Sequence, residues 1–347
     1  MKITSITLNR LVAQDSNMIR KIFRKLKHVA LIPLKILSKP IYITEWYKSF
    51  FVGADGETYP DNYWYRKHDE RNFDLINLGS SGGKWAFDYS GLDIKAMNWA
   101  QQPQTLLEDF NLLRNYHSIL KKGGFVLITI MPFTGLNKST GVRDAMKYLK
   151  IHAHEPIQPV EIKKARLYTQ YPILMGKPAI KAVIKHWLGK ENVANVKKKT
   201  DVENNPMSDI QLDADAKRWI DGWKKQFSIE NFEVPLTEVN QKGREYRIKL
   251  MRELIDFCIE RTYKPVYVIP PVTKHLSQYY TPKFEETYVY GFLKSVDRNI
   301  LLLDYSKNES LQKDDLFFNS FFLNKKGRNI FTEQVITDLQ QRNNCVV

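Results

Sequence analysis

A glycine- and serine-rich turn after the first strongly apolar run holds the residues best suited to chemistry. Residues 73–87 read FDLINLGSSGGKWAF, and the turn itself is Gly79-Ser80-Ser81-Gly82-Gly83. Such a turn can bind a phosphate through backbone N–H groups, lie against an adenosyl cofactor, or present a serine as a nucleophile. Each of these three kinds of site requires particular residues next to the turn.

The phosphate alternative fits poorly. A phosphate-binding loop of the G-x-x-x-x-G-K-[ST] type needs a hydroxyl after the lysine. Here Trp85 follows Lys84, and the glycines are too close together. The dinucleotide pattern G-x-G-x-x-G is also missing from the turn. The sequence therefore does not predict a nucleotide site here.

A second alternative is a resemblance to methyltransferases that use S-adenosylmethionine. The segment DLINLGSSGG resembles their glycine-rich turn, and LLRNYHSILKKGGFVLITI resembles a later helix and strand of that family. Only one weak strand and one helix fit between Gly83 and Lys121, where the family has two strand-helix units. The second strand ends in Asn98-Trp99, with no acidic residue to hold a ribose. This remains the alternative hypothesis.

The third alternative makes Ser81 a nucleophile raised at a strand-to-helix turn. Its chemistry needs backbone N–H groups for a developing oxyanion and a histidine to accept the hydroxyl proton. Both must be positioned by the rest of the fold.

The elements that would position these groups are strands and helices in alternation. Helical patterns separate most of the apolar runs, and such alternation predicts an α/β fold with three layers and a five-stranded, mostly parallel sheet. The segment 105–124 is predicted as a helix that stops at Gly123-Gly124. The five predicted strands are residues 73–79, 94–100, 124–132, 265–271 and 299–305.

In this order the motifs resemble the SGNH (GDSL-like) hydrolase superfamily, in particular the SGNH-like proteins of bacterial surface-polysaccharide gene clusters. That resemblance implies a flavodoxin-like sheet, Ser81 as candidate nucleophile and Asn98 near the oxyanion site. Residues 315–332, DLFFNSFFLNKKGRNIFT, resemble the last block, where D-x-x-H-L-N-x-x-G supplies the catalytic Asp and His. Laid on that pattern, Asn319 takes the Asp position and Phe322 the His position. Phenylalanine cannot accept a proton, so the general base is missing.

Three other histidines are candidate replacements for the missing base or candidate metal ligands. His275 follows the fourth strand and is a possible replacement base at the same sheet edge. His152, His154 and Glu155 form an H-x-H-E cluster, which is interpreted as polar surface because no further ligands lie at suitable spacing. No metal and no cofactor is expected.

The chain divides into four predicted parts. Residues 1–60 form a basic N-terminal extension, 61–135 and 237–347 the two parts of the α/β domain, and 136–236 a helical insertion or cap. Trp219, Trp223 and Phe227 in the insertion recur at helical spacing, which is typical of packing.

The net charge of +15 indicates an anionic partner. Residues 19–39 alternate apolar and basic positions as in an amphipathic helix, so an anionic membrane surface is one candidate partner. A glycan or acylated polysaccharide precursor is the other, and nucleic acid is not expected. Two cysteines and no apolar leader favour the cytoplasm, with peripheral attachment to the inner membrane face as an option. The expected function is an SGNH-like esterase or O-acyltransferase that uses Ser81, or a non-catalytic glycan-binding relative.

Overall fold

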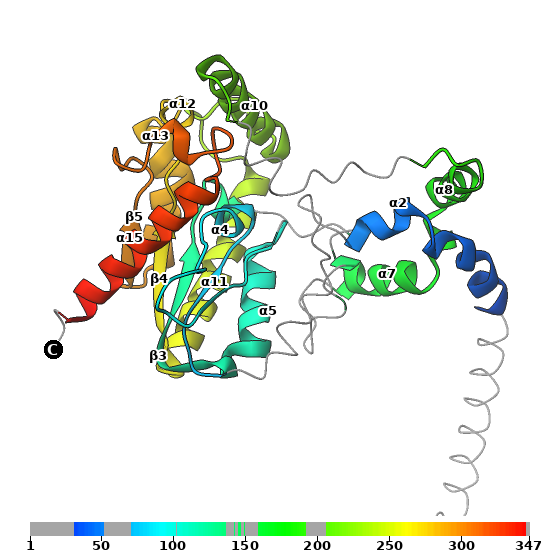
Figure 1. The fold of residues 1–347 in the computed structure, drawn as a ribbon, viewed down its shortest axis with the longest axis horizontal. Helices are drawn as coiled ribbons and strands as arrows, with labels where there is room; N and C mark the ends of the chain where they lie inside the picture. Colours follow the sequence, from blue (N-terminus) through cyan, green and yellow to red (C-terminus); the bar gives the residue numbers. More distant parts are fainter. Residues whose placement is uncertain are drawn as a thin grey trace, which may run out of the picture.

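The computed structural model describes residues 31–51, 71–101, 103–136, 159–191 and 206–344, with residues 142, 145, 146 and 149. The described residues form an α/β domain and a smaller helical unit, which Figure 1 draws beside it. None of the described helices combines the length and apolar character needed to cross a bilayer.

The α/β domain is built on a five-stranded sheet whose strands are all parallel, as the sequence predicts. The strand order is β2-β1-β3-β4-β5, so the chain begins in the middle of the sheet and winds outward in both directions. The strands are β1 (Phe73–Leu78), β2 (Ala96–Asn98), β3 (Leu120–Thr129), β4 (Lys264–Ile269) and β5 (Leu301–Asp304).

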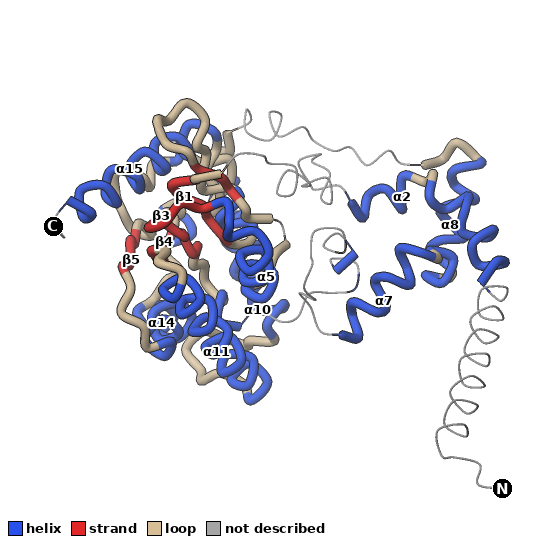
Figure 2. Tube along the Cα trace, turned by 90° about the horizontal axis from the view of Figure 1, so that it is seen from below, coloured by secondary structure: helices blue, strands red, loops and turns tan. Residues whose placement is uncertain are grey.

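Helices cover both faces of the sheet and give three layers, which Figure 2 shows edge on. Side chains alternate along each strand, so that Val126 and Ile128 face one layer while Leu127 faces the other. The first layer contains α5 (Leu106–Tyr116), α11 (Glu238–Glu260) and α14 (Gly291–Val296). The opposite layer contains α15 (Lys325–Asn344).

One sequence prediction fails at the start of β3. The helix of 105–124 does not run to Gly123-Gly124: α5 ends at Tyr116, one 3₁₀ turn η3 (His117–Ile119) follows, and Leu120 already pairs with Phe73. The next pair joins Leu75 to Phe125, so residues 121–124 bulge out of register. Gly123 has a φ of 71°, a conformation that glycine adopts without strain. The two glycines therefore serve a bulge in a strand and not a helix end.

Short elements complete the carboxyl edge of the sheet, where parallel strands end together. Helix α10 (Asp209–Phe227), from the insertion, packs there against α12. The remaining elements at or near this edge are α4 (Ser81–Lys84), η4 (Thr134–Leu136), α12 (Lys274–Ser277), α13 (Pro282–Glu285), η6 (Glu286–Tyr290) and η7 (Asp314–Leu316).

The helical unit combines segments far apart in the sequence. A helix over residues 31–42, α2 (Glu45–Lys48) and η1 (Ser49–Phe51) pack with α7 (Pro159–Gln170), η5 (Pro172–Met175) and α8 (Lys177–Trp187). Ile41, Ala179 and Val183 are buried in its core. Thus part of the predicted insertion, α7 and α8, packs with part of the predicted N-terminal extension, whereas α10 packs on the α/β domain.

Candidate functional site

Ser81 lies at the position expected of a nucleophile in a parallel α/β sheet. It is the first residue of α4, directly after β1, and its side chain is half-buried. Gly79 has a φ of 135°, which lets the chain turn sharply from strand to helix. Among the residues that the structure describes, none forms a hydrogen bond with the Ser81 hydroxyl. The turn presents the serine, but no base in the described ranges is hydrogen-bonded to it.

The glycines of this turn allow α4 to pack tightly on the next strands. A Cβ on Gly83 would lie 2.8 Å from Thr129 Oγ1 and 2.9 Å from Ala100 Cβ. A Cβ on Gly82 would overlap the side chain of Met131. The space that a glycine leaves is therefore filled by the protein's own atoms, and the sequence pattern is explained by packing without a phosphate or adenosyl ligand.

A buried carboxyl group that the sequence analysis missed holds the turn in place. Asp109 of α5 accepts hydrogen bonds from Gly79 N at 2.8 Å and Gln104 Nε2 at 2.6 Å. Burial raises the pKa of Asp109 to about 7; the nearby Glu108 carboxylate acts in the same direction, and the two hydrogen bonds oppose the shift. Gln104 also donates to the carbonyl of Gly79 at 3.1 Å. Asp109 and Gln104 thus bind both backbone groups of the residue that precedes the two serines.

A weak signal for this network exists in the sequence. Thr105 and Glu108 form a capping box at the start of α5, and the pattern T-x-x-E is readable without a structure. Asp109 would then be taken as a second acidic residue that complements the helix dipole. Only the packing of α5 against the sheet shows that it points into the core.

Asn98 ends β2 beside the turn, as predicted, but its side chain is committed to structure. Its Nδ2 donates to the carbonyls of Gly83, Lys84 and Phe87 at 3.1–3.4 Å. Its Oδ1 accepts from Asn77 Nδ2 at 2.8 Å. With both ends of the amide used in this way, Asn98 stabilises the loop after α4 and offers no spare N–H to an oxyanion.

The last block does come close to the serine turn. Trp85, which ends α4, packs edge to face on Phe318 with 4.8 Å between ring centroids and lies 6.5 Å from the ring of Phe322. Asn319, which the motif resemblance aligns with a catalytic aspartate, accepts from the backbone N–H groups of Phe321 and Phe322 at 2.9 and 2.7 Å. It acts as a turn-forming side chain. Among the described residues no imidazole forms a hydrogen bond with Ser81, and the predicted histidine position holds the aromatic ring of Phe322.

Aromatic rings fill the carboxyl edge around Phe322. Trp219 of α10 contacts Phe322 edge to face at 5.4 Å, and the ring of Phe321 lies 4.6 Å from it. We call this assembly the aromatic plug. Its members are Trp85, Phe133, Trp219, Trp223, Phe227, Phe232, Phe284, Tyr288, Phe318, Phe321 and Phe322.

One residue of the aromatic plug has a strained backbone conformation. Phe133, just after β3, has a φ of 70°, which is rare for a large side chain. Its ring stacks on Phe227 at 4.9 Å and lies 4.8 Å from Tyr288, so packing compensates the backbone strain. The adjacent hollow between the ends of β3 and β4 measures about 10 Å³. Ligand pockets are usually hundreds of cubic ångströms, so this hollow takes no substrate.

Helix α10 is fixed over this edge by a buried carboxylate. Asp215 accepts from both the backbone N–H and the hydroxyl of Ser320, at 3.1 and 2.7 Å. The same carboxylate accepts from Trp219 Nε1 at 3.1 Å and from the guanidinium of Arg218. An acidic group with this many donors is satisfied although it is buried. It joins the insertion to the last block.

His275, the possible replacement base, lies in a different network. Its two ring nitrogens are 2.7 Å from Asp213 Oδ1 and 3.3 Å from Asp314 Oδ2. Partial burial lowers its pKa, but the hydrogen bonds to the two carboxylates outweigh this and raise it above the ordinary value. The structure shows no hydrogen bond between His275 and Ser81 within the described ranges. An imidazole with both ring nitrogens engaged by carboxylates has no nitrogen free to accept a proton from Ser81.

The same histidine belongs to the metal-compatible cluster of the described residues. Asp209, His275 and Asp314 each offer an atom within 4.8 Å of the others. Mixed carboxylate and imidazole donors suit a divalent transition ion. The two aspartates are exposed, however, and the ring nitrogens of His275 are paired with Asp213 and Asp314, so an ion-pair network accounts for the position of the imidazole.

Neither of the two other histidines in the described ranges adds a base to the site. His117 Nδ1 is hydrogen-bonded to the hydroxyl of Tyr263 at the opposite edge of the sheet. His186 pairs with Glu191 in the helical unit. The cluster of His152, His154 and Glu155 lies outside the described residues.

No model of a known protein family matches this chain, and no curated protein matches it. The fold class is therefore established by the sheet and its layers alone.

Proposed function

We propose that this chain is a non-catalytic relative of the SGNH hydrolases that acts by binding, in bacterial surface-polysaccharide metabolism, a glycan or an acylated polysaccharide precursor. The fold class and the location of Ser81 support the SGNH part of the proposal. The polysaccharide part is supported by the motif resemblance of residues 73–132 and 240–340.

The observation that carries the loss of catalysis is the surroundings of Phe322. A serine hydrolase needs a base within hydrogen-bond reach of its nucleophile. Here the residue at the histidine position is buried between Trp85, Trp219 and Phe321, and it cannot exchange protons. Without its triad partners a serine retains only a small part of the usual rate enhancement.

Nucleophile reactivity gives the direct test. The intact protein is incubated with a fluorophosphonate and its mass is measured, with hydrolysis of p-nitrophenyl acetate followed in parallel. We expect no adduct at Ser81 and equal hydrolysis by the wild type and Ser81→Ala. A stoichiometric adduct that disappears in Ser81→Ala would show that the serine is activated, and the non-catalytic proposal would be wrong.

Restoring the missing groups tests the motif alignment. Asn319→Asp keeps an oxygen that can accept from the two backbone N–H groups, and Phe322→His places an imidazole near the turn. The double variant should gain weak esterase activity that Ser81→Ala abolishes. A folded double variant without any gain would mean that residues 315–332 are not the counterpart of the SGNH last block.

Binding is tested separately with immobilised fragments of bacterial surface polysaccharides, each with and without its O-acetyl groups. We expect the wild type and Ser81→Ala to bind the same fragments equally, because recognition does not require the hydroxyl. Failure to bind any fragment would contradict the glycan part of the proposal and leave the catalytic part standing.

A further inference from the structure

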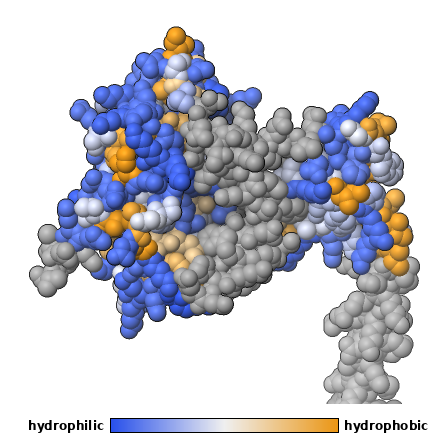
Figure 3. Space-filling model, viewed as in Figure 1, coloured by the Kyte–Doolittle hydropathy of each residue, from blue (hydrophilic) through white to orange (hydrophobic). Residues whose placement is uncertain are grey.

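The helical unit exposes an unusual amount of apolar surface. In the described part of the chain, 17 large hydrophobic side chains are exposed, and 11 of them belong to residues 31–51 and 159–191. Figure 3 shows such side chains over α8 and over the helix of residues 31–42. Isolated exposed hydrophobics are ordinary, but a concentration of them marks an interaction surface.

In α8 these side chains form one stripe. Ala179, Ala182 and Val183 face the core of the unit. The exposed apolar residues follow a spacing of four, three and one, so they share a different face of the helix. They are Ile180 (49% exposed), Ile184 (48%), Trp187 (72%) and Leu188 (61%).

Lysines border this stripe along one side. Lys177, Lys181 and Lys185 recur every four residues, next to the apolar stripe on the helical wheel. Among the described residues neither Lys181 nor Lys185 has an acidic partner. The nearby acids are occupied: Glu45 pairs with Lys48 at 2.8 Å and Glu191 with His186 at 2.6 Å.

The helix of residues 31–42 repeats the arrangement. Its buried side is formed by Ser38 and Ile41, while Ile32 and Ile36 are 46% and 58% exposed on the opposite side. Lys35 and Lys39 are exposed along an edge of this apolar face. Residues 31–51 and 159–191 together contain ten basic and three acidic residues, a formal charge of +7.

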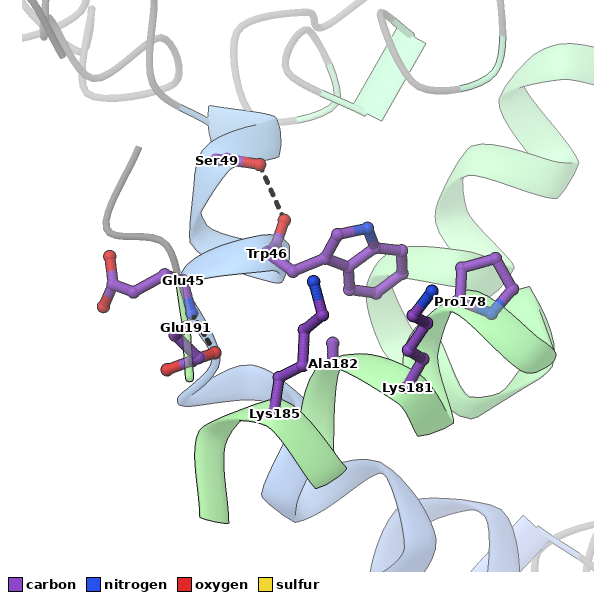
Figure 4. Close-up of a pocket in the computed structure, with 8 residues that line it drawn as sticks. All are labelled: Glu45, Trp46, Ser49, Pro178, Lys181, Ala182, Lys185 and Glu191. Atoms are coloured by element: carbon purple, nitrogen blue, oxygen red, sulfur yellow. Dashed lines mark hydrogen bonds between the residues drawn. The ribbon is translucent and has the colours of Figure 1, made fainter. Parts of the chain in front are cut away.

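A pocket of about 370 Å³ opens between α2 and α8 beside the lysine edge. Figure 4 shows Lys181 and Lys185 extending from α8 toward the indole of Trp46, with Glu45 and Glu191 farther to one side. The two ammonium groups and the aromatic wall can receive a phosphate group next to an apolar surface.

We propose that this unit docks on an anionic lipid bilayer, with the apolar stripes of α8 and residues 31–42 in the acyl boundary and the lysines on lipid phosphates. Apolar residues including tryptophan, bordered by lysine, are the composition of helices that lie in a membrane interface. The excess positive charge complements an anionic leaflet. This inference is independent of the proposed function of the α/β domain.

Vesicle flotation tests the inference with the full chain. The protein is mixed with vesicles of pure phosphatidylcholine or of phosphatidylcholine with one quarter phosphatidylglycerol. We expect binding to the anionic vesicles that weakens as salt rises, since exposed charges are screened. Binding to neither vesicle would overturn the proposal.

Paired variants locate the surface. Ile184→Glu with Trp187→Glu should weaken vesicle binding by about tenfold or more, because two apolar anchors are lost. The matched control is Ile210→Glu, an apolar residue of α10 that is 82% exposed, which should bind as the wild type does. Lys181→Gln with Lys185→Gln should remove the preference for anionic vesicles. Unchanged binding by the α8 variants would refute this location.

The competing occupant of such a surface is a second copy of the chain. Light scattering coupled to size exclusion measures this directly. A dimer that the Ile184→Glu, Trp187→Glu variant dissociates, together with no vesicle binding, would overturn the membrane proposal and assign the stripe to self-association. A monomer that floats with anionic vesicles supports the proposal.

Discussion

Asp109 gives the sharpest test of how the serine turn is held. The substitution Asp109→Asn keeps an oxygen that can accept from Gly79 N and Gln104 Nε2, and it removes the ionisable group. Because burial raises the pKa of Asp109 to about 7, the folded protein holds this proton more tightly than the unfolded chain does. The stabilisation from the protonated carboxyl is complete below the ordinary pKa of the group and is lost as the pH rises through 7.

The size of the expected change in unfolding free energy follows from the pKa shift of Asp109. A carboxyl that moves from 3.8 to about 7 costs the folded state about 4 kcal/mol when both states are ionised. About 3 kcal/mol of this cost develops between pH 5 and pH 8. The free energy of unfolding of Asp109→Asn, relative to that of the wild type, should increase by this amount over the same interval.

Urea unfolding at pH 5, 6, 7 and 8, followed by tryptophan fluorescence, measures the difference. Subtracting the wild type from the variant removes the contributions of other titrating groups, His275 included. Asp256→Asn is the matched control without a pH-dependent change. The hydrogen bonds from the Arg298 guanidinium lower the pKa of Asp256, so both its folded and unfolded pKa lie below pH 5, and the difference in unfolding free energy between its variant and the wild type should stay constant from pH 5 to pH 8.

A different result would refute the reasoning. If Asp109→Asn is less stable than the wild type at pH 8 and the difference does not change with pH, the carboxylate is charged at neutral pH. Its hydrogen bonds, and not its burial, would then dominate.

Three further predictions concern the same region. Asp215→Ala should lower the unfolding free energy by about 3 kcal/mol, since it leaves the buried donors of Ser320 without an acceptor. Ser320→Ala should lower the unfolding free energy by less. Equal losses for the two variants in urea unfolding would contradict this prediction. Gly83→Ala should lower the unfolding free energy by about 1–3 kcal/mol through overpacking. Gly222→Ala is the control, because its Cβ position is open and its backbone is helical; it should raise the unfolding free energy by up to about 1 kcal/mol in the same assay. Asn98→Ala should lower the unfolding free energy by about 2 kcal/mol, because the carbonyls of Lys84 and Phe87 lose the Nδ2 donor whereas that of Gly83 keeps backbone N–H donors. A thermal unfolding midpoint equal to the wild type's would show that water replaces the amide.

Much of the fold was predictable because its signals are local. The strands of residues 73–79, 124–132 and 265–271 are apolar runs bounded by glycine or proline, and the alternation of strands and helices predicts a parallel sheet. The start of β3 was not predictable in this way. Gly123-Gly124 is equally compatible with a helix end and a strand bulge, and the pairing of Leu120 with Phe73 decides between them.

The features of the candidate site also fall into those that depend on local sequence and those that depend on long-range contacts. The sequence by itself determines the parallel α/β sheet, the strand-to-helix turn at Ser81 and the absence of a proton acceptor at Phe322, since these depend on local pattern and residue type. Only the tertiary structure shows that Asn98 is bound to backbone, that Asp109 is buried under the turn, and that α10 brings Trp219 onto Phe322. It also joins residues 31–51 to residues 159–191. All of these are contacts between segments distant in the sequence, and no local preference encodes which segments meet.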